Sequence, residues 1–221
     1  MELGRAQLGA PAHLRRVSVA RMSGGPESEI VLVRHGETEW SKSGQHTGRT
    51  DIPMTEKGRE QAGKIAHSKH VQGRSFTLVL CSPLSRAWET CELSGLGAQA
   101  HVEKTDDLLE FNYGEAEGRT TAEIRKEIPG WSLWTHGVKE GETADQVGAR
   151  ADRVLTQARA AGGTVALVAH GHMLRILATR WIGLPANDAR LFALSTASVS
   201  VLGWEREQPV FEVWNDTSHF L

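Results

Sequence analysis

Two short apolar segments that each end in a His-Gly pair constrain the fold of this chain most strongly. Ile30-Val31-Leu32-Val33 runs into Arg34-His35-Gly36, and Val165-Ala166-Leu167-Val168-Ala169 runs into His170-Gly171-His172. Short β-branched runs bounded by polar residues are typical of fully buried strands in a parallel sheet. Because ligands in open α/β sheets bind beyond the carboxyl ends of the strands, both histidines are predicted to lie in one ligand site.

The rest of the chain alternates strand patterns with helix patterns. Capping boxes at Thr120-Thr121-Ala122-Glu123 and Thr143-Ala144-Asp145-Gln146 predict two helix starts. The alternation predicts an α/β protein, a three-layer α/β/α sandwich with a mostly parallel central sheet, closed by a hairpin or edge pair. Strands are expected at 29–34, 77–81, 101–102, 164–169, 198–204 and 210–214, helices at 55–68, 82–93, 120–128, 143–161 and 172–183, and a loop at 41–53.

Composition indicates one domain and excludes several kinds of partner. A chain of 221 residues with 39% hydrophobic content fits one α/β domain, expected at 29–221. A formal net charge of −2 gives no reason to expect nucleic acid or anionic lipid as a partner, so any phosphate-binding charge must be concentrated locally. No apolar run approaches the ~18 residues of a membrane span. Cys81 and Cys91 are too few for a disulfide framework and indicate free thiols, so we expect a cytoplasmic protein.

Residues 1–28 differ from the rest of the chain. Arg5, Arg15, Arg16 and Arg21 are separated mainly by small residues. We expect a disordered extension, with an organelle-targeting segment and a true start at Met22 as alternatives.

Two arginines are placed to bind a phosphoryl group. Arg34 follows the first strand, and Arg86 opens a helix after another strand, in the run Ser82-Pro83-Leu84-Ser85-Arg86. A planar guanidinium group can donate two parallel hydrogen bonds to phosphoryl oxygens. Since phosphoryl transfer depends mainly on positioning and charge neutralisation, this pair indicates a phosphoryl-transfer site.

His35 is the candidate nucleophile of this site. A neutral imidazole can attack phosphorus and form a covalent phosphohistidine, which splits hydrolysis into two easier steps. Arg34, Arg86 and a protonated His170 are expected to lower the pKa of His35 and so favour its neutral form. His170 is also expected to supply a third cationic or hydrogen-bonding contact to the transferred group.

The proton donor is expected to be a glutamate in segment 108–118. Apolar neighbours could desolvate the Glu110 carboxyl group and keep it protonated for the departing alkoxide. Spacing alone does not separate Glu110 from Glu115 or Glu117.

Several groups of residues then occur in a fixed order along the chain. They are Arg34-His35-Gly36-Glu37-Thr38, Thr47-Gly48, Asp51-Ile52-Pro53-Met54-Thr55 with Gly58, Ser82-Pro83 with Arg86-Ala87 and Thr90, Glu110 with Gly114 and Glu117-Gly118, Gly141-Glu142-Thr143, and His170-Gly171. Together they resemble the histidine phosphatase superfamily, in its phosphoglycerate-mutase-like branch. The resemblance covers roughly residues 30–204.

The resemblance implies a metal-independent phosphomonoesterase that needs no cofactor and acts on a small phosphorylated metabolite. It implies His35 as the phosphorylated nucleophile and Glu110, in preference to its acidic neighbours, as the proton donor. The phosphate pocket that it implies consists of Arg34, Arg86 and His170. Further substrate contacts are expected from Ser41, Thr47, Gly48, Tyr113, Gly171 and His172.

The chain departs from the mutases of this family. Those enzymes carry Glu-Arg-His-Tyr-Gly around the acid and an Arg pair further on, whereas this chain has Glu110-Phe111-Asn112-Tyr113-Gly114 and no Arg-Arg after it. Ser41 and His172 also stand where the mutases have asparagine. The lost cations favour hydrolysis, with a cofactor-dependent phosphoglycerate mutase as the alternative. Segment 131–137 resembles phosphatases of small sugar phosphates, including sedoheptulose-bisphosphatase-like proteins.

Two other function classes compete with the phosphatase. A zinc hydrolase would use His170 and His172 with His46 or His136, but no carboxylate or third histidine stands at a supporting spacing. A binding protein on an inactive phosphatase fold predicts loss of a catalytic residue, and all five are present. Trp131 and Trp134 are candidates for a pocket wall, a lid or an oligomer contact. The oligomeric state and the physiological substrate are left open.

Overall fold

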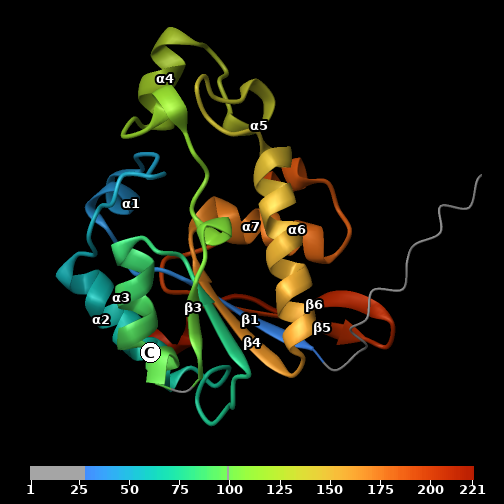
Figure 1. The fold of residues 1–221 in the computed structure, drawn as a ribbon. Helices are drawn as coiled ribbons and strands as arrows, with labels where there is room; N and C mark the ends of the chain where they lie inside the picture. The colour runs from blue at the N-terminus through green and yellow to red at the C-terminus, as the bar shows by residue number, and fades with distance from the viewer. Residues whose placement is uncertain (1–27, 99) are drawn as a thin grey trace, which may run out of the picture.

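The computed structural model describes residues 28–98 and 100–221. Residues 1–27, where we expect an extension, lie outside this part of the chain. The strands are β1 (Glu29–Arg34), β2 (Leu78–Cys81), β3 (Val102–Lys104), β4 (Thr164–Ala169), β5 (Val199–Glu205) and β6 (Gln208–Asp216). The α-helices are α1 (Glu39–Ser43), α2 (Glu56–Lys64), α3 (Ser85–Leu93), α4 (Thr121–Glu127), α5 (Leu133–His136), α6 (Ala144–Ala161) and α7 (Gly171–Trp181) (Figure 1).

The strands form one mixed sheet in the order β3-β2-β4-β1-β5-β6. Strands β3, β2, β4 and β1 are parallel, while β5 and β6 form the antiparallel edge. Side chains alternate between the two faces of a strand. Ile30 and Leu32 therefore pack in the core under α6 and α7, and Val31 and Val33 pack in the core under α3. This confirms the predicted three-layer sandwich with a mostly parallel sheet.

The two strands that carry the His-Gly pairs lie side by side. β1 and β4 pair in register from Glu29 with Thr164 to Arg34 with Ala169, and both have the predicted bounds. The His35 amide donates to the Ala169 carbonyl at 3.0 Å, which continues the ladder beyond the strand end. His35 and His170 therefore leave the sheet together at the carboxyl ends of two neighbouring parallel strands.

Helix α3 begins later than the sequence predicts. The Ser82 amide still donates to the Val168 carbonyl of β4, so this residue extends the sheet and does not open a helix. The first helical residue is Ser85, whose amide and hydroxyl donate to the Asp51 carboxylate at 2.9 and 2.8 Å. A carboxylate from a distant loop thus accepts from the first helical amide, whereas we had expected the helix to begin at Ser82-Pro83.

Segment 41–53 is not wholly a loop, because the short helix α1 covers its first residues. Thr38 and Ser41 form a capping box at its start, and Gly44 ends it in the left-handed conformation at φ 78°. Helices α4 and α5 lie away from the sheet, at the top of Figure 1. Within residues 28–98 and 100–221, no helix combines the length and apolar character needed to span a membrane.

Candidate active site

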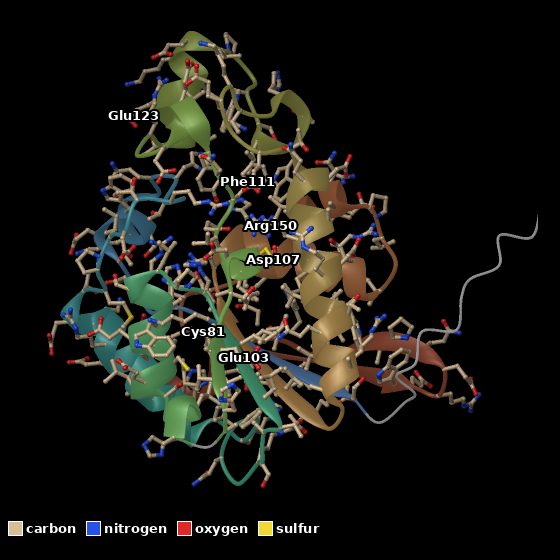
Figure 2. The ribbon with its side chains drawn as sticks, viewed as in Figure 1. Cys81, Glu103, Asp107, Phe111, Glu123 and Arg150 are labelled. Atoms are coloured by element: carbon tan, nitrogen blue, oxygen red, sulfur yellow. The ribbon has the colours of Figure 1, made fainter. Side chains whose placement is uncertain are left out.

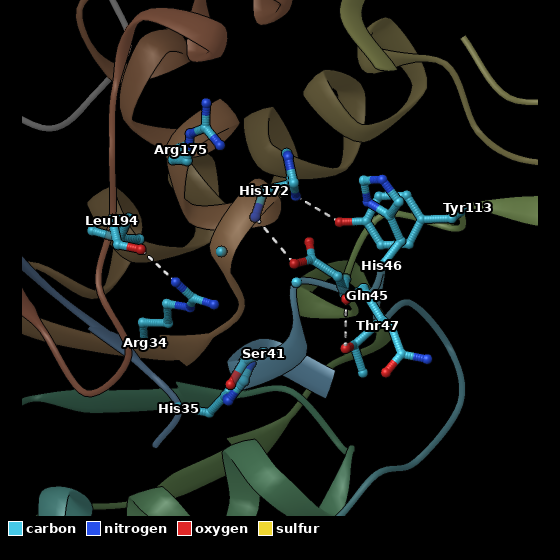
Figure 3. Close-up of a pocket in the computed structure, with 13 residues that line it drawn as sticks. Arg34, His35, Ser41, Gln45, His46, Thr47, Tyr113, His172, Arg175 and Leu194 are labelled. Atoms are coloured by element: carbon cyan, nitrogen blue, oxygen red, sulfur yellow. Dashed lines mark hydrogen bonds between the residues drawn. The ribbon is translucent and has the colours of Figure 1, made fainter. Parts of the chain in front are cut away.

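A cavity of about 200 Å³ opens at the carboxyl ends of β1 and β4 (Figure 3). Most of the residues expected in the site line it: Arg34, His35, Ser41, Thr47, Glu110, Tyr113, Gly171 and His172. Arg86, His170 and Gly48 do not line it. The His170 ring lies 5.2 Å from the His35 ring, and Arg86 donates to His170 and to the Gly48 carbonyl. The structure therefore brings the predicted residues together from four separate parts of the chain.

The His35 ring is buried and held in one tautomer. Its Nδ1 lies 2.7 Å from the Gly36 carbonyl, which can only accept a hydrogen bond, so Nδ1 carries the proton. Burial, and then the charges of Arg86 and Arg34, lower the pKa of His35 well below its ordinary value. The ring is therefore neutral near pH 7, with the Nε2 lone pair available.

The guanidinium group of Arg34 is held at the wall of the cavity. Its Nη1 donates to the Leu194 carbonyl, while its buried Nε has no hydrogen-bond partner among the described residues. A Cβ added at Gly171 would lie only 3.3 Å from Arg34 Cζ and 3.4 Å from its Nε, so the absence of a side chain there lets the guanidinium rest against the start of α7. These two contacts fix the position of the side chain before any ligand arrives.

Arg86 and His170 form a buried pair behind the nucleophile. Arg86 Nε donates to His170 Nδ1 at 3.2 Å, so the His170 proton is on Nε2, which donates to Ser82 Oγ at 2.7 Å. Burial, followed by the charge of Arg86, lowers the pKa of His170 well below its ordinary value. The rings of His35 and His170 are 5.2 Å apart. His170 is thus a neutral ring that positions Arg86, and its direct contact with a phosphoryl group stays a prediction.

Glu117 holds the loop that positions Arg86. Its carboxylate accepts from the amides of Gly48, Arg49 and Thr50 at 3.0, 3.4 and 2.8 Å. The carbonyls of Gly48 and Thr50 then accept from Arg86 Nη2 and Nη1 at 2.9 and 3.0 Å. A Cβ at Gly48 would lie 2.3 Å from the Glu117 carboxylate, so only glycine fits. Gly48 therefore contacts Arg86 and Glu117, whereas we had expected it to contact the substrate.

Glu110 lies buried at the first turn of α7. Its carboxylate accepts from the amides of His172 and Met173 at 3.0 and 2.9 Å, and from its own neighbour Phe111 at 2.9 Å. Burial agrees with the expected desolvation, but these three donors were not foreseen. Together they hold the carboxyl group at the start of α7, where it lines the cavity.

A second pair of charged residues fixes the chain around Glu110. Arg150 donates from Nη1 to the Asp107 and Leu109 carbonyls at 2.8 Å each, and Figure 2 shows it beside Asp107. Its Nε and Nη2 donate to the Glu142 carboxylate at 2.9 and 3.0 Å, and Glu142 also accepts from the Asn112 amide. The backbone on both sides of Glu110 is thus tied to α6.

Five cavity residues were not among the predicted site residues: Gly44, Gln45, His46, Arg175 and Leu194. Gln45 and His46 lie in the loop after α1, which pairs with the segment before α4 through the His46 amide and the Arg119 carbonyl. Arg175 lies one turn after His172 on α7, a spacing that could have revealed it. Leu194 belongs to a loop whose sequence carries no motif that would indicate a ligand site.

The structure does not support the zinc hydrolase alternative, because its expected histidine ligands are engaged by other residues. Both ring nitrogens of His170 are engaged by Arg86 and Ser82, and His172 Nδ1 lies 2.6 Å from the Tyr113 hydroxyl. Among residues 28–98 and 100–221, no three His, Cys, Asp or Glu side chains gather in a way that could hold a metal ion.

The two tryptophans of segment 131–137 pack around the cavity residues and not on its surface. Trp134 lies against His172 with ring centroids 5.3 Å apart and ring planes tilted by 44°, and the buried Trp131 meets His46 edge-on at 5.5 Å. They therefore support the wall residues, and an oligomer contact stays untested.

Comparison with known proteins gives a consistent result. Residues 30–217 match the sequence model described as Histidine phosphatase superfamily (branch 1). An acid phosphatase from Mycobacterium tuberculosis is 38% identical over 192 residues, which cover 86% of this chain and 93% of that protein. Sedoheptulose 1,7-bisphosphatase from Saccharomyces cerevisiae is 36% identical over 183 residues, covering 70% of this chain and 67% of that protein.

A solved structure agrees with this result. The mycobacterial glucosyl-3-phosphoglycerate phosphatase in complex with VO3 superposes with a TM-score of 0.75 at 29% identity, over 85% of this chain and 98% of that one.

Proposed function

Because this chain belongs to the histidine phosphatase superfamily, branch 1, it is a phosphatase, and we propose that it hydrolyses small phosphorylated metabolites through phospho-His35. The observation that carries the proposal is the state of His35. Its ring is neutral, its Nδ1 proton is bound by Gly36, and its free Nε2 belongs to a side chain that lines a cavity with Arg34 and Glu110.

In the first step, His35 Nε2 attacks phosphorus and the phosphorus–oxygen bond to the substrate alcohol breaks. Arg34 and Arg86 offset the charge of the phosphoryl oxygens. Glu110 gives a proton to the departing alkoxide, which leaves as a neutral alcohol.

In the second step, water attacks the phosphorus of phospho-His35. The Glu110 carboxylate accepts a proton from that water, and the bond between phosphorus and Nε2 breaks. Inorganic phosphate leaves, and His35 returns to its neutral form with the proton still on Nδ1. The cycle needs no further co-reactant.

The size of the cavity supports a small substrate. A space of about 200 Å³ accepts a phosphoryl group and a few carbons, which fits a metabolite better than a phosphorylated protein side chain on a bulky backbone. The proposed substrate class agrees with the names of the yeast and mycobacterial relatives. A phosphate-release screen over sugar phosphates, phosphoglycerates and nucleoside monophosphates tests it directly, and release from none of them would contradict the proposal.

We expect catalysis to need no metal ion, since guanidinium and imidazole groups surround the phosphoryl position. Excess chelator should leave the rate of phosphate release unchanged, whereas vanadate, which mimics five-coordinate phosphorus, should inhibit. Activity that disappears in chelator and returns with zinc would instead support a metal site at His170 and His172.

The alternative is a phosphoglycerate mutase, and the missing cations argue against it. A mutase must retain a doubly phosphorylated, highly anionic intermediate while it reorients. Phe111 and Asn112 stand beside Glu110 here, and Phe111 is buried, so neither supplies a charge to hold such an intermediate. At about 1.5–3 kcal/mol for each hydrogen bond to a charged group, losing two or three shortens its residence by orders of magnitude.

We therefore expect phosphate release to exceed isomerisation. The assay supplies 3-phosphoglycerate with catalytic 2,3-bisphosphoglycerate and follows 2-phosphoglycerate against free phosphate. Isomerisation that is tenfold faster than phosphate release would establish the mutase.

A further inference from the structure

Arg175 lines the same cavity as Arg34, His35 and Glu110 (Figure 3). We propose that Arg175 binds a second anionic group of the substrate, a carboxylate or another phosphate, and so selects metabolites that carry one. The inference rests on the proposed phosphatase function and concerns which phosphate esters this site prefers.

The placement of Arg175 on α7 sets its distance from the phosphoryl position. Gly171, against which Arg34 rests, and Arg175 are four residues apart, so they share one face of the helix. At 1.5 Å per residue they are about 6 Å apart along the helix axis. A group that contacts Arg34 and one that contacts Arg175 can therefore belong to one small molecule.

The guanidinium group of Arg175 is held in place before any ligand arrives. Its Nε and Nη2 both donate to the Ala189 carbonyl, at 2.9 and 2.7 Å. Its Cζ lies 5.2 Å from the centroid of the Trp134 ring, which stacks against it. Nη1 makes no hydrogen bond to any described residue. The two hydrogen bonds to Ala189 thus fix the orientation of the guanidinium group, and Nη1 is available to a ligand.

Arg175 is not paired with a carboxylate among the described residues, and the Glu110 carboxyl group of the same cavity acts on its charge only from a longer distance. Within the described part of the chain, no Asp or Glu lies at ion-pair distance from it, whereas Arg150 pairs with Glu142 and Arg180 with Asp152. The two charges of a phosphoryl group are already matched by Arg34 and Arg86. A further, partly buried cation in the cavity therefore favours a substrate with a further negative charge.

Matched substrate pairs test this directly. 3-Phosphoglycerate and glycerol 3-phosphate share a three-carbon skeleton and differ by a carboxylate in place of a hydroxymethyl group. Fructose 1,6-bisphosphate and fructose 6-phosphate differ by the second phosphate. We expect the wild-type kcat/KM to favour the more anionic member of at least one pair by about tenfold or more, and the pair that shows this identifies the second group.

Replacement of Arg175 should remove that preference. In Arg175→Gln we expect the ratio of kcat/KM values within the preferred pair to fall at least about tenfold, mainly through KM, while Arg175→Lys retains part of it. Arg190→Gln is the matched control, because Arg190 is an exposed arginine that pairs with Asp188 outside the cavity. Its ratio should equal that of the wild type.

The outcomes separate this inference from the proposed function. Phosphate release without a preference in either pair, or an unchanged preference in Arg175→Gln, overturns the role of Arg175 and leaves the phosphatase intact. No release from these esters or from p-nitrophenyl phosphate overturns both. If Arg175→Gln does not fold, the absence of a preference in the wild type still overturns the role of Arg175, and Arg175→Lys tests any preference that is found.

Discussion

Replacing His35 with alanine is expected to abolish phosphate release. The substitution removes the Nε2 lone pair that attacks phosphorus, and no other described nucleophile is placed to take over. His170 has both ring nitrogens engaged, and His172 Nδ1 lies 2.6 Å from the Tyr113 hydroxyl. Loss of a covalent nucleophile commonly lowers kcat by about 10³-fold or more. The measurement is phosphate release from the best substrate of the screen.

The intermediate itself should be visible in the wild-type protein. After a rapid acid-free quench during turnover, mass spectrometry should find one phosphoryl group on His35, and the label should disappear in acid. His101→Ala is the control for a histidine substitution, because His101 is exposed at the far end of the parallel strands. Retention of more than a few per cent of activity in His35→Ala would remove the covalent mechanism.

The fold was predictable where its signals are local. Val31 and Val33 are 0% exposed, and the run that contains them reads as a strand because both of its faces are buried. The start of α3 was not predictable in this way. Its cap is the Asp51 carboxylate, which lies 34 positions before Ser85 and reaches it only in the folded chain. Helix α1 was missed because five residues are too few to show a periodic pattern.

The site was predictable where its residues follow strand ends, and not where several residues of one type compete for a role. His35 and His170 follow strand ends, so topology alone brings them together. Three glutamates competed for the role of acid, and spacing did not separate them. In the structure, Glu115 pairs with the exposed Lys139, and Glu117 holds a loop, which leaves Glu110 as the carboxylate that faces the cavity. Those roles are set by residues far away in sequence, so only the folded chain distinguishes them.

The stability of the protein is expected to fall steeply as the pH drops from 7.5 to 5.5. Burial is the first cause that lowers the pKa of His35, His170 and His172 well below the ordinary value of 6.5. In the unfolded chain these histidines take up protons below pH 6.5, whereas in the folded protein they stay neutral. The unfolded state then binds more protons, so the free energy of unfolding decreases with falling pH.

The expected size of this effect is large. Each histidine contributes about 1.4 kcal/mol over that interval, so the three together contribute about 4 kcal/mol of a total that is commonly 5–15 kcal/mol. With a urea m-value of about 2 kcal/mol/M, the unfolding midpoint should drop by about 2 M. Urea titrations at pH 7.5, 6.5 and 5.5 measure it. An unchanged midpoint would show that these rings take up protons in the folded protein as well.

The variant that loses the nucleophile should also be less sensitive to acid. His35→Ala removes one of these three buried rings, so about a third of their contribution to the pH dependence should disappear. The same desolvation that keeps the His35 ring neutral for attack on phosphorus therefore reduces stability at low pH. If the slope of stability against pH stays at the wild-type value in His35→Ala, the neutral state of this ring, and with it the basis for its nucleophilicity, is wrong.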